Sequence, residues 1–361
     1  MAHTRSKILV VGPHLDNSGG VANLYKTLRQ VPRYEESVDY FVNGNRKNAH
    51  LFTPIFDLIR FMGVFYKYKV IHFNPSLEYK SIIRDNTYIL LSLMFGKKTI
   101  VSLMGWNEKV AARLMRSSLL KRMTIRAFNK SHALTVLSAS FKKVFEDFGI
   151  KKMPEVITPT YDIKMENMLF EDKNFDKHRI RILYMARIEL SKGIYKVLDI
   201  FNLLNQADSG IEYSYTVVGD GSELENMKAK ARELGLEIEF KSYVSKAIEK
   251  EKIYNEHDLF LFPSEHPEGF PLILAEALKG GLVIVASDAG GIGGELDSSN
   301  GIILSKESAA PIYVETIIEL LQQNNFTEKS RYNKKFAVEK FGPETRVDSY
   351  LNLYNRVLDQ N

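Results

Sequence analysis

Two glutamates eight positions apart are the residues best suited to chemistry in this sequence. Glu268 lies in the segment PSEHPEGFP (263–271), which follows an apolar run, and Glu276 lies in the helical pattern that comes next. Ionised carboxylates are strong acceptors, so the first is suited to sugar hydroxyls and the second to a ribose diol. The competing interpretation is an ordinary helix with one acid near its start and one solvated glutamate.

The residues between these glutamates favour the ligand-binding interpretation. Gly269 lets a ligand approach the backbone closely, because glycine has no side chain. The free amides at the start of the helix favour a phosphate group. We therefore expect the donor-binding residues of this segment to be Gly269, Phe270, Pro271, Leu272 and Glu276, with Glu268 in a catalytic role.

Two cations follow another apolar run and form the second candidate group. Arg187 and Lys192 lie in ARIELSKG (186–193), directly after the run 181–185. Arginine grips two oxygens of a diphosphate at once, whereas lysine acts as a point charge. Charge builds on a leaving diphosphate, so both cations would stabilise that transition state. Taken alone, such residues are more often ordinary surface cations.

Glycine turns after two other strands are further candidates. Gly19 and Gly20 follow the apolar run 7–11 and precede a helical pattern. Their amides are suited to binding a phosphate at the helix start. Gly219 ends the run 213–218 and is expected to shape the wall of the nucleotide pocket. Plain tight turns explain all three glycines equally well.

Short apolar runs alternate with helical patterns along the whole chain. This alternation predicts an α/β fold with parallel sheets covered on both sides. The expected strands are 7–11, 70–73, 99–103, 134–137, 181–185, 213–218, 238–240, 259–262 and 283–286. The expected helices of the second half are 195–205, 223–234 and 272–278, and a last amphipathic helix covers 344–358.

The length of 361 residues suits two domains better than one. The segment 151–176 carries two prolines, Pro154 and Pro159, and then polar residues, and its part 159–176 is the predicted hinge. The prediction is therefore two Rossmann-like doubly wound domains, 1–158 and 177–343, that face a central cleft. Ligands of such sheets bind at the carboxyl ends of the strands.

The composition narrows the classes of protein. Hydrophobic residues make up 45% and charged residues 26% of the chain, as in globular proteins, and there is no cysteine for a disulfide or a thiolate metal site. No Asp-x-Asp motif occurs, and no metal or cofactor is expected. The apolar runs are too short for a membrane span, and no signal peptide is visible. A cytoplasmic protein, peripheral at the inner face of the membrane, is expected.

Basic residues outnumber acidic residues two to one in the first 170 positions, whereas acids are in excess afterwards. No nucleic-acid-binding motif accompanies the basic half, so an anionic membrane surface or a lipid-linked acceptor fits better. Segment 109–130 has no acid and interleaves cations with apolar residues, as membrane-surface helices do. The cations assigned to this acceptor or membrane side are Arg113, Arg116, Lys121 and Arg122. A solvated helix face is the competing interpretation.

The four motifs, in this order, resemble the family-4 glycosyltransferases of the GT-B fold. The resemblance implies that Arg187 and Lys192 contact the diphosphate of a UDP- or GDP-sugar, that Glu268 contacts the transferred sugar and that Glu276 binds the ribose. It also implies that Gly19 and Gly20 lie by the donor phosphates and the acceptor. The same resemblance assigns Tyr243 and Val244 to the wall of the base pocket, and it places the final helix, 344–361, on the N-terminal domain.

The implied activity is retaining, metal-independent transfer of a sugar to a saccharide or lipid-linked saccharide, in bacterial surface polysaccharide or glycolipid synthesis. One departure stands out. Family members commonly carry His-Gly where this chain has Met104-Gly105, followed by Trp106, on the acceptor side. Methionine cannot donate a strong hydrogen bond, so His72 or another group would have to substitute.

Two other functions are compatible with the same fold. A nucleotide-sugar epimerase would need residues for proton abstraction and no acceptor site. A non-catalytic sugar-binding partner would keep the fold without the activity, and Met104 keeps that alternative open. The basic segment and the Arg187–Lys192 block favour sugar transfer.

Overall fold

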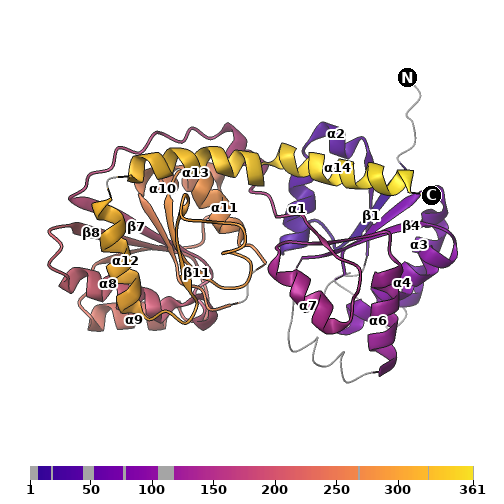
Figure 1. The fold of residues 1–361 in the computed structure, drawn as a ribbon, viewed down its shortest axis with the longest axis horizontal. Coiled ribbons are helices and arrows are strands. Elements are labelled where there is room, and N and C mark those ends of the chain that lie inside the picture. Colours follow the sequence, from indigo (N-terminus) through magenta and orange to yellow (C-terminus); the bar gives the residue numbers. More distant parts are fainter. Residues whose placement is uncertain are drawn as a thin grey trace. The chain divides into compact units, whose positions relative to one another are not determined.

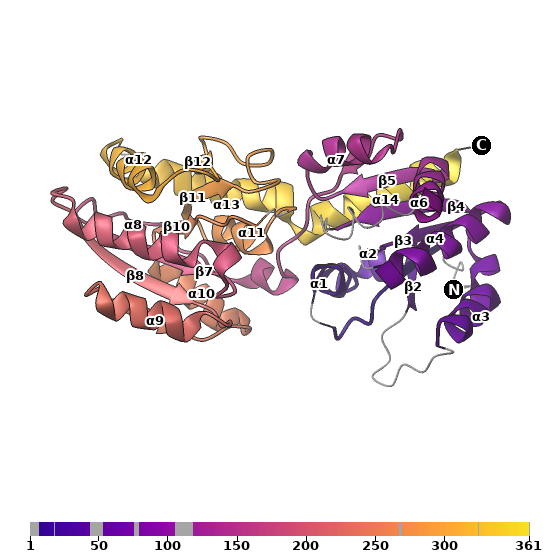
Figure 2. The ribbon, with the colours of Figure 1, turned by 90° about the horizontal axis from the view of Figure 1, so that it is seen from below.

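The computed structural model describes residues 7–17, 19–43, 53–75, 79–104, 118–266, 269–323 and 325–360. The chain forms two compact units. The first unit comprises 1–160 together with 343–361, and the second comprises 161–342. Both sheets and their flanking helices can be followed in Figures 1 and 2.

The first unit is built on a parallel sheet of six strands in the order β2-β1-β3-β4-β5-β6. Its strands are β1 Ile8–Gly12, β2 Val38–Val42, β3 Val70–Phe73, β4 Lys98–Leu103, β5 Ala133–Val136 and β6 Glu155–Val156. Its helices are α1 Gly20–Leu28, α2 Pro32–Glu35, α3 Thr53–Val64, α4 Tyr79–Met94, α6 Ser118–Lys130, α7 Ser140–Phe148 and α14 Pro343–Asp359, and a 3-10 turn, η1, covers Phe65–Lys67.

The two faces of this sheet bury different kinds of residue. Helices α3, α4, α6 and α7 pack an apolar, phenylalanine-rich core on one face. On the other face, α1 and α14 contribute a cluster of buried tyrosines. Tyr350 and Tyr354 of α14 both stack near the His72 ring of β3, with ring centroids 5.7 and 5.6 Å away. The C-terminal helix is thereby part of the first unit's core.

The second unit has a parallel sheet of six strands in the order β12-β11-β10-β7-β8-β9. Its strands are β7 Arg179–Met185, β8 Glu212–Val218, β9 Ile238–Lys241, β10 Leu259–Phe262, β11 Val283–Asp288 and β12 Gly301–Ser305. Its helices are α8 Ile194–Gln206, α9 Leu224–Glu233, α10 Ala247–Glu256, α11 Leu272–Lys279, α12 Ala310–Gln322 and α13 Phe326–Phe341, with 3-10 turns η2 Ile163–Asn167 and η3 Leu190–Lys192.

Alternation along the strands divides this unit into two apolar layers. Ile182 and Tyr184 of β7 point into the layer covered by α8, α9 and α12. Leu183 and Met185 of the same strand point into the layer covered by α10, α11 and α13. A strand buried on both faces reads as a continuous apolar run, which is why RILYM is visible in the sequence.

Nearly all of the segment 159–176, which was predicted as the hinge, lies in the second unit. From Tyr161 onward it belongs to the second unit, where Tyr161, Met165 and Met168 are buried. Tyr161 and Met165 lie in the same core layer as α11. The buried Lys173 donates from Nζ to the backbone oxygens of Tyr254 and Asn255. The two prolines therefore come just before the chain enters the second unit, and the polar residues after them belong to that unit.

Candidate donor-binding site

The loop after β7 carries both predicted cations, in very different surroundings. The Arg187 side chain is 68% exposed, and its guanidinium lies 2.8 Å from the Glu189 carboxylate. Lys192 ends η3 and is only 7% exposed, and its carbonyl accepts a hydrogen bond of 3.0 Å from the Tyr184 hydroxyl. The loop thus offers one exposed cation and one that is largely buried and whose backbone carbonyl is held by Tyr184.

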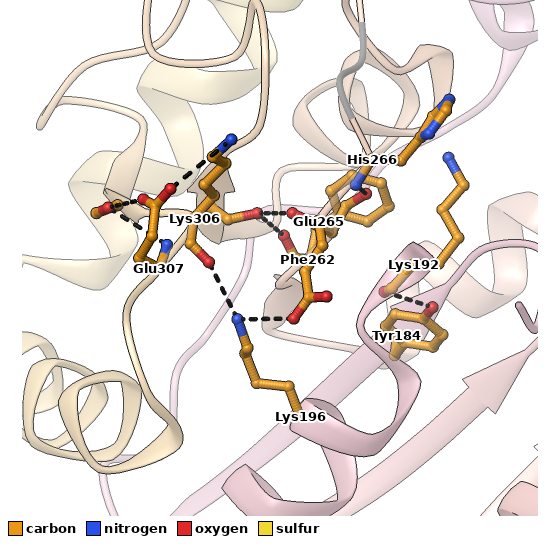
Figure 3. Close-up of polar contacts among 11 residues, drawn as sticks. Tyr184, Lys192, Lys196, Phe262, Glu265, His266, Lys306 and Glu307 are labelled. Carbon is orange, nitrogen blue, oxygen red and sulfur yellow. Dashed lines mark hydrogen bonds and ion pairs between the residues drawn. The ribbon is translucent and has the colours of Figure 1, made fainter. Parts of the chain in front are cut away.

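Gly193 brings this loop against the loop after β10. Its φ of 72° is left-handed, and a Cβ there would lie 2.1 Å from the Pro263 carbonyl oxygen, so only glycine fits. The amides of Glu265 and His266 both donate to the Ser191 carbonyl, at 3.0 and 2.9 Å. The side chains of Lys192 and His266 extend from the two loops toward the same side (Figure 3).

Gly219 has a packing role at the end of β8. Its φ is 148°, and a Cβ would lie 1.9 Å from the Ala186 carbonyl oxygen. Its amide donates 3.0 Å to the carbonyl of Lys241. The turn therefore lets the backbone after β8 contact the backbone just before Arg187. This contact supports the start of the loop that carries Arg187.

Glu276 lies buried in α11 and is held by two residues that the sequence analysis did not identify. Lys250 Nζ lies 2.8 and 2.7 Å from the two carboxylate oxygens. The Tyr254 hydroxyl donates 3.0 Å to Oε2 and also lies 3.9 Å from the Met185 sulfur at the end of β7. The carboxylate is thereby placed next to the strand end that leads into Arg187.

Lys250 and Tyr254 were missed for a physical reason. Helix α10, which carries both, has little amphipathic pattern, so no helix was predicted there. Their contact with Glu276 spans more than twenty positions and depends on how α10 packs beside α11. Burial raises the pKa of the Tyr254 phenol well above its ordinary value, so the hydroxyl stays protonated and acts as a donor.

The residues before Glu276 differ in how far they are buried. Gly269 is half-buried, and Pro271 caps the start of α11 just before Leu272. The Phe270 side chain is 4% exposed and stacks on Phe341 with ring centroids 4.6 Å apart. Its ring therefore belongs to the core, and only its backbone is available to a donor.

The two residues predicted to line the base pocket follow β9. Tyr243 is 67% exposed, and its amide donates 2.9 Å to the Asp220 carboxylate. Val244 is buried in the layer shared with α11. The exposed tyrosine ring is available for stacking, whereas the valine side chain is packed in the core.

Several predicted residues lie outside the described residues. They are Glu268, Trp106, Arg113 and Arg116. In the first unit, Gly19 and the first residue of α1, Gly20, are both exposed, and Met104 is half-buried just after β4. Lys121 and Arg122 lie on α6, the first half-buried and the second exposed.

His72 does not substitute for the family histidine. It is completely buried in β3, with Nδ1 2.8 Å from the Tyr354 hydroxyl and Nε2 2.5 Å from the Ser102 hydroxyl. Burial lowers the pKa of the imidazole to about 3, so the ring is neutral. Its inward position in the middle of β3 makes it part of the core beneath α14.

Neither metal ligands nor a membrane span is found in the described part of the chain. No group of three or more His, Asp or Glu side chains there is arranged to hold a metal ion. None of the helices described is both long and apolar enough to cross a bilayer.

Comparison with known proteins identifies the second unit. Residues 166–336 match the family model "Glycosyl transferases group 1". The second unit is a group 1 glycosyltransferase domain. Its two predicted signatures, around Arg187 and Glu276, both fall within the matched residues.

Two relatives of this glycosyltransferase domain are named as lipopolysaccharide glycosyltransferases. The lipopolysaccharide 1,6-galactosyltransferase of Salmonella typhimurium is 27% identical over 172 residues, which are 44% of this chain and 46% of that protein. The lipopolysaccharide 1,2-N-acetylglucosaminetransferase of the same organism is 26% identical over 218 residues, 55% of this chain and 56% of that protein. The matches therefore span about half the length of these relatives.

A solved structure extends the likeness to the whole fold. Anabaena HepE, crystallised with UDP-glucose, matches with a TM-score of 0.68 over 98% of this chain and 100% of that one, at 17% identity. At that identity the likeness establishes the fold, which is GT-B with its two doubly wound units. The predicted fold class is thereby confirmed.

Proposed function

We propose that the protein transfers a sugar from a UDP- or GDP-sugar to a saccharide or lipid-linked saccharide, in bacterial surface polysaccharide or glycolipid synthesis. One observation carries this proposal: a cationic loop and a buried carboxylate lie together at the end of β7 in the second unit. Arg187 and Lys192 follow β7, and Glu276 lies beside the end of that strand through Tyr254 and Met185. Cations suit the diphosphate, and the carboxylate suits a ribose hydroxyl.

The proposed transfer retains anomeric configuration and needs no metal. The bond between the sugar C1 and the diphosphate oxygen breaks, and the diphosphate leaves with the electron pair. Arg187 and Lys192 stabilise that charge. The acceptor hydroxyl attacks from the same face and gives its proton to the leaving phosphate, so no protein base is required. Lys192 is especially effective in this account, because its burial weakens screening by water.

Two comparisons support the choice of substrates. The neighbour crystallised with UDP-glucose has the same fold, which supports a nucleotide-sugar donor. The relatives named as lipopolysaccharide transferases support a saccharide of the bacterial surface as acceptor.

Incubation of the purified protein with UDP-, GDP- and ADP-sugars and candidate acceptors tests the proposal. A glycosylated acceptor supports transfer, and NMR of its new anomeric centre with an α-linked donor distinguishes retention from inversion. Undiminished turnover in EDTA supports metal independence. An isomerised donor would instead indicate an epimerase, and donor binding without turnover would indicate a sugar-binding partner.

We further propose that the first unit docks on anionic membranes at the cytoplasmic face. The described residues of α6 contain no acid, and Arg122, Arg126 and Lys130 are exposed beside Leu119, which is 71% exposed. Exposed cations next to an exposed apolar side chain suit the headgroup region of a bilayer. Co-sedimentation with phosphatidylglycerol vesicles at low salt tests this. In 0.5 M salt the Debye length is roughly one-third of its value at low salt, so exposed charges attract the headgroups less. Binding that weakens under this condition supports docking, and no binding to the vesicles at low salt would refute it.

A further inference from the structure

Lys250 is the cation closest to the carboxylate that the proposed function assigns to the ribose. It stands on α10, and its ammonium reaches both oxygens of Glu276 on α11, at 2.8 and 2.7 Å. We propose that Lys250 is a positioning residue for ribose recognition, which holds the Glu276 carboxylate so that it accepts a hydrogen bond from the ribose. This inference rests on the proposed function.

Both members of the pair are largely buried, so the Glu276 carboxylate depends on Lys250 as its partner. The side chains are only 15% and 8% exposed. A carboxylate removed from water is costly unless an opposite charge and hydrogen bonds compensate it. Lys250 supplies the charge, and by reaching both oxygens it also fixes the plane of the carboxylate.

Tyr254 supplies the second restraint from the same helix. It lies one turn after Lys250, so both side chains project from one face of α10. Its hydroxyl donates 3.0 Å to Oε2, and burial keeps it protonated by raising its pKa. The carboxylate is thus held by a charge and a hydrogen bond before any donor arrives.

This restraint has a consequence for the choice of nucleotide. A carboxylate offers about four acceptor positions, and the three contacts from Lys250 and Tyr254 leave one of them for a ribose hydroxyl. A fixed carboxylate can discriminate ribose from 2′-deoxyribose, because a missing hydroxyl leaves an oriented, poorly solvated acceptor unpaired. A carboxylate that rotates freely would lose that discrimination.

Helix α10 also provides a matched control. Lys252 pairs with Glu256 at 3.7 Å, but these side chains are 75% and 44% exposed. An exposed pair of this kind contributes little to stability. Lys252→Met therefore removes a lysine and an ion pair from the same helix without touching Glu276.

Titration calorimetry with UDP and 2′-deoxy-UDP, and with the corresponding guanine nucleotides, tests the proposal on the intact protein. We expect the wild type to prefer the ribose form by about 10-fold. Lys250→Met should weaken binding of the ribose form by about 10-fold and abolish most of the preference. Lys250→Arg should restore much of it, and Lys252→Met should match the wild type.

The outcomes separate this inference from the proposed function. Failure of the wild type to bind UDP or GDP would overturn both. Binding with ribose preference in the wild type, unchanged in Lys250→Met, would overturn the role of Lys250 alone. Tighter binding by Lys250→Met would also overturn it, by showing that the lysine competes with the ribose. If circular dichroism shows that Lys250→Met is unfolded, Tyr254→Phe decides, with a reduced preference supporting the proposal and an unchanged preference overturning it.

Discussion

Arg187 and Lys192 stand five positions apart in one loop, yet water reaches them very differently. Arg187 is free to leave Glu189 for a stronger anion, because that contact is exposed and worth little. Lys192 is buried, and its carbonyl is held by the Tyr184 hydroxyl. The pair therefore suits a leaving group whose charge grows during the reaction.

Removal of the exposed arginine should affect chemistry more than folding. We expect Arg187→Ala to lower turnover by about 100-fold, because it removes a cation from the developing charge. Steady-state kinetics with the donor that the nucleotide-sugar screen selects measures this. Arg179→Ala is the matched control, since Arg179 pairs with Glu212 at 3.6 Å at the opposite end of β7. Near wild-type turnover in Arg187→Ala would contradict the assigned role.

The loops of the second unit depend on close backbone contacts that only glycine permits. Gly193→Ala should displace the Lys192 loop, because its Cβ would overlap the Pro263 carbonyl in addition to the strain of a left-handed φ. Gly210→Ala is the control, with a φ of 67° and nothing within 4 Å of the added Cβ.

We expect Gly210→Ala to cost about 1 kcal/mol of stability, from backbone strain alone. Gly193→Ala should cost more than that and should also weaken UDP binding, because the loop that carries Lys192 moves. Chemical unfolding and calorimetry measure the two effects. Equal losses of stability and unchanged nucleotide affinity in the two variants would show that the contact does not position the loop.

The elements differ in how far the sequence reveals them. Strands such as β7 and β10 are buried on both faces and stand out as apolar runs. Strand β2 has only two buried residues, Val38 and Phe41, and β12 is half-buried at the sheet edge, so neither was expected. Helices α10, α12 and α13 were also missed, and α10 shows why, because its residues are mostly polar.

The candidate site was predictable in part for the same reason. The spacing of Arg187 and Lys192, and that of Glu268 and Glu276, is local and can be recognised in the sequence. The partners of Glu276 come from α10, and only the packing of that helix brings Lys250 and Tyr254 to the carboxylate. The prediction that His72 could take the place of the family histidine was wrong. The sequence does not reveal that α14 covers this side chain.

At the scale of the whole molecule, the C-terminal helix completes the first unit over a neutral histidine. Burial lowers the pKa of His72 to about 3, below the ordinary value of 6.5. The unfolded chain therefore takes up a proton as the pH falls below about 6.5, whereas the folded chain does not until about 3. The stability that this group contributes is present above pH 6.5 and is lost as the pH falls toward 3.

This predicts an acid-sensitive first unit. We expect the free energy of unfolding to fall with pH between 6 and 4, with His72 contributing up to about 1.4 kcal/mol per pH unit. Urea unfolding can be followed by the single tryptophan, Trp106, which falls within the residue range of the first unit. His72→Gln cannot titrate and should show a flatter dependence, whereas an identical slope in both proteins would exclude His72 as the cause.

The central claim is that one nucleoside diphosphate contacts the second unit's cations and its buried carboxylate together. A crystal structure with bound UDP or GDP tests this most directly. The account predicts the diphosphate within hydrogen-bonding distance of Arg187 and Lys192, and a ribose hydroxyl on Glu276. A nucleotide seated elsewhere, with these three side chains directed away from it, would contradict the account.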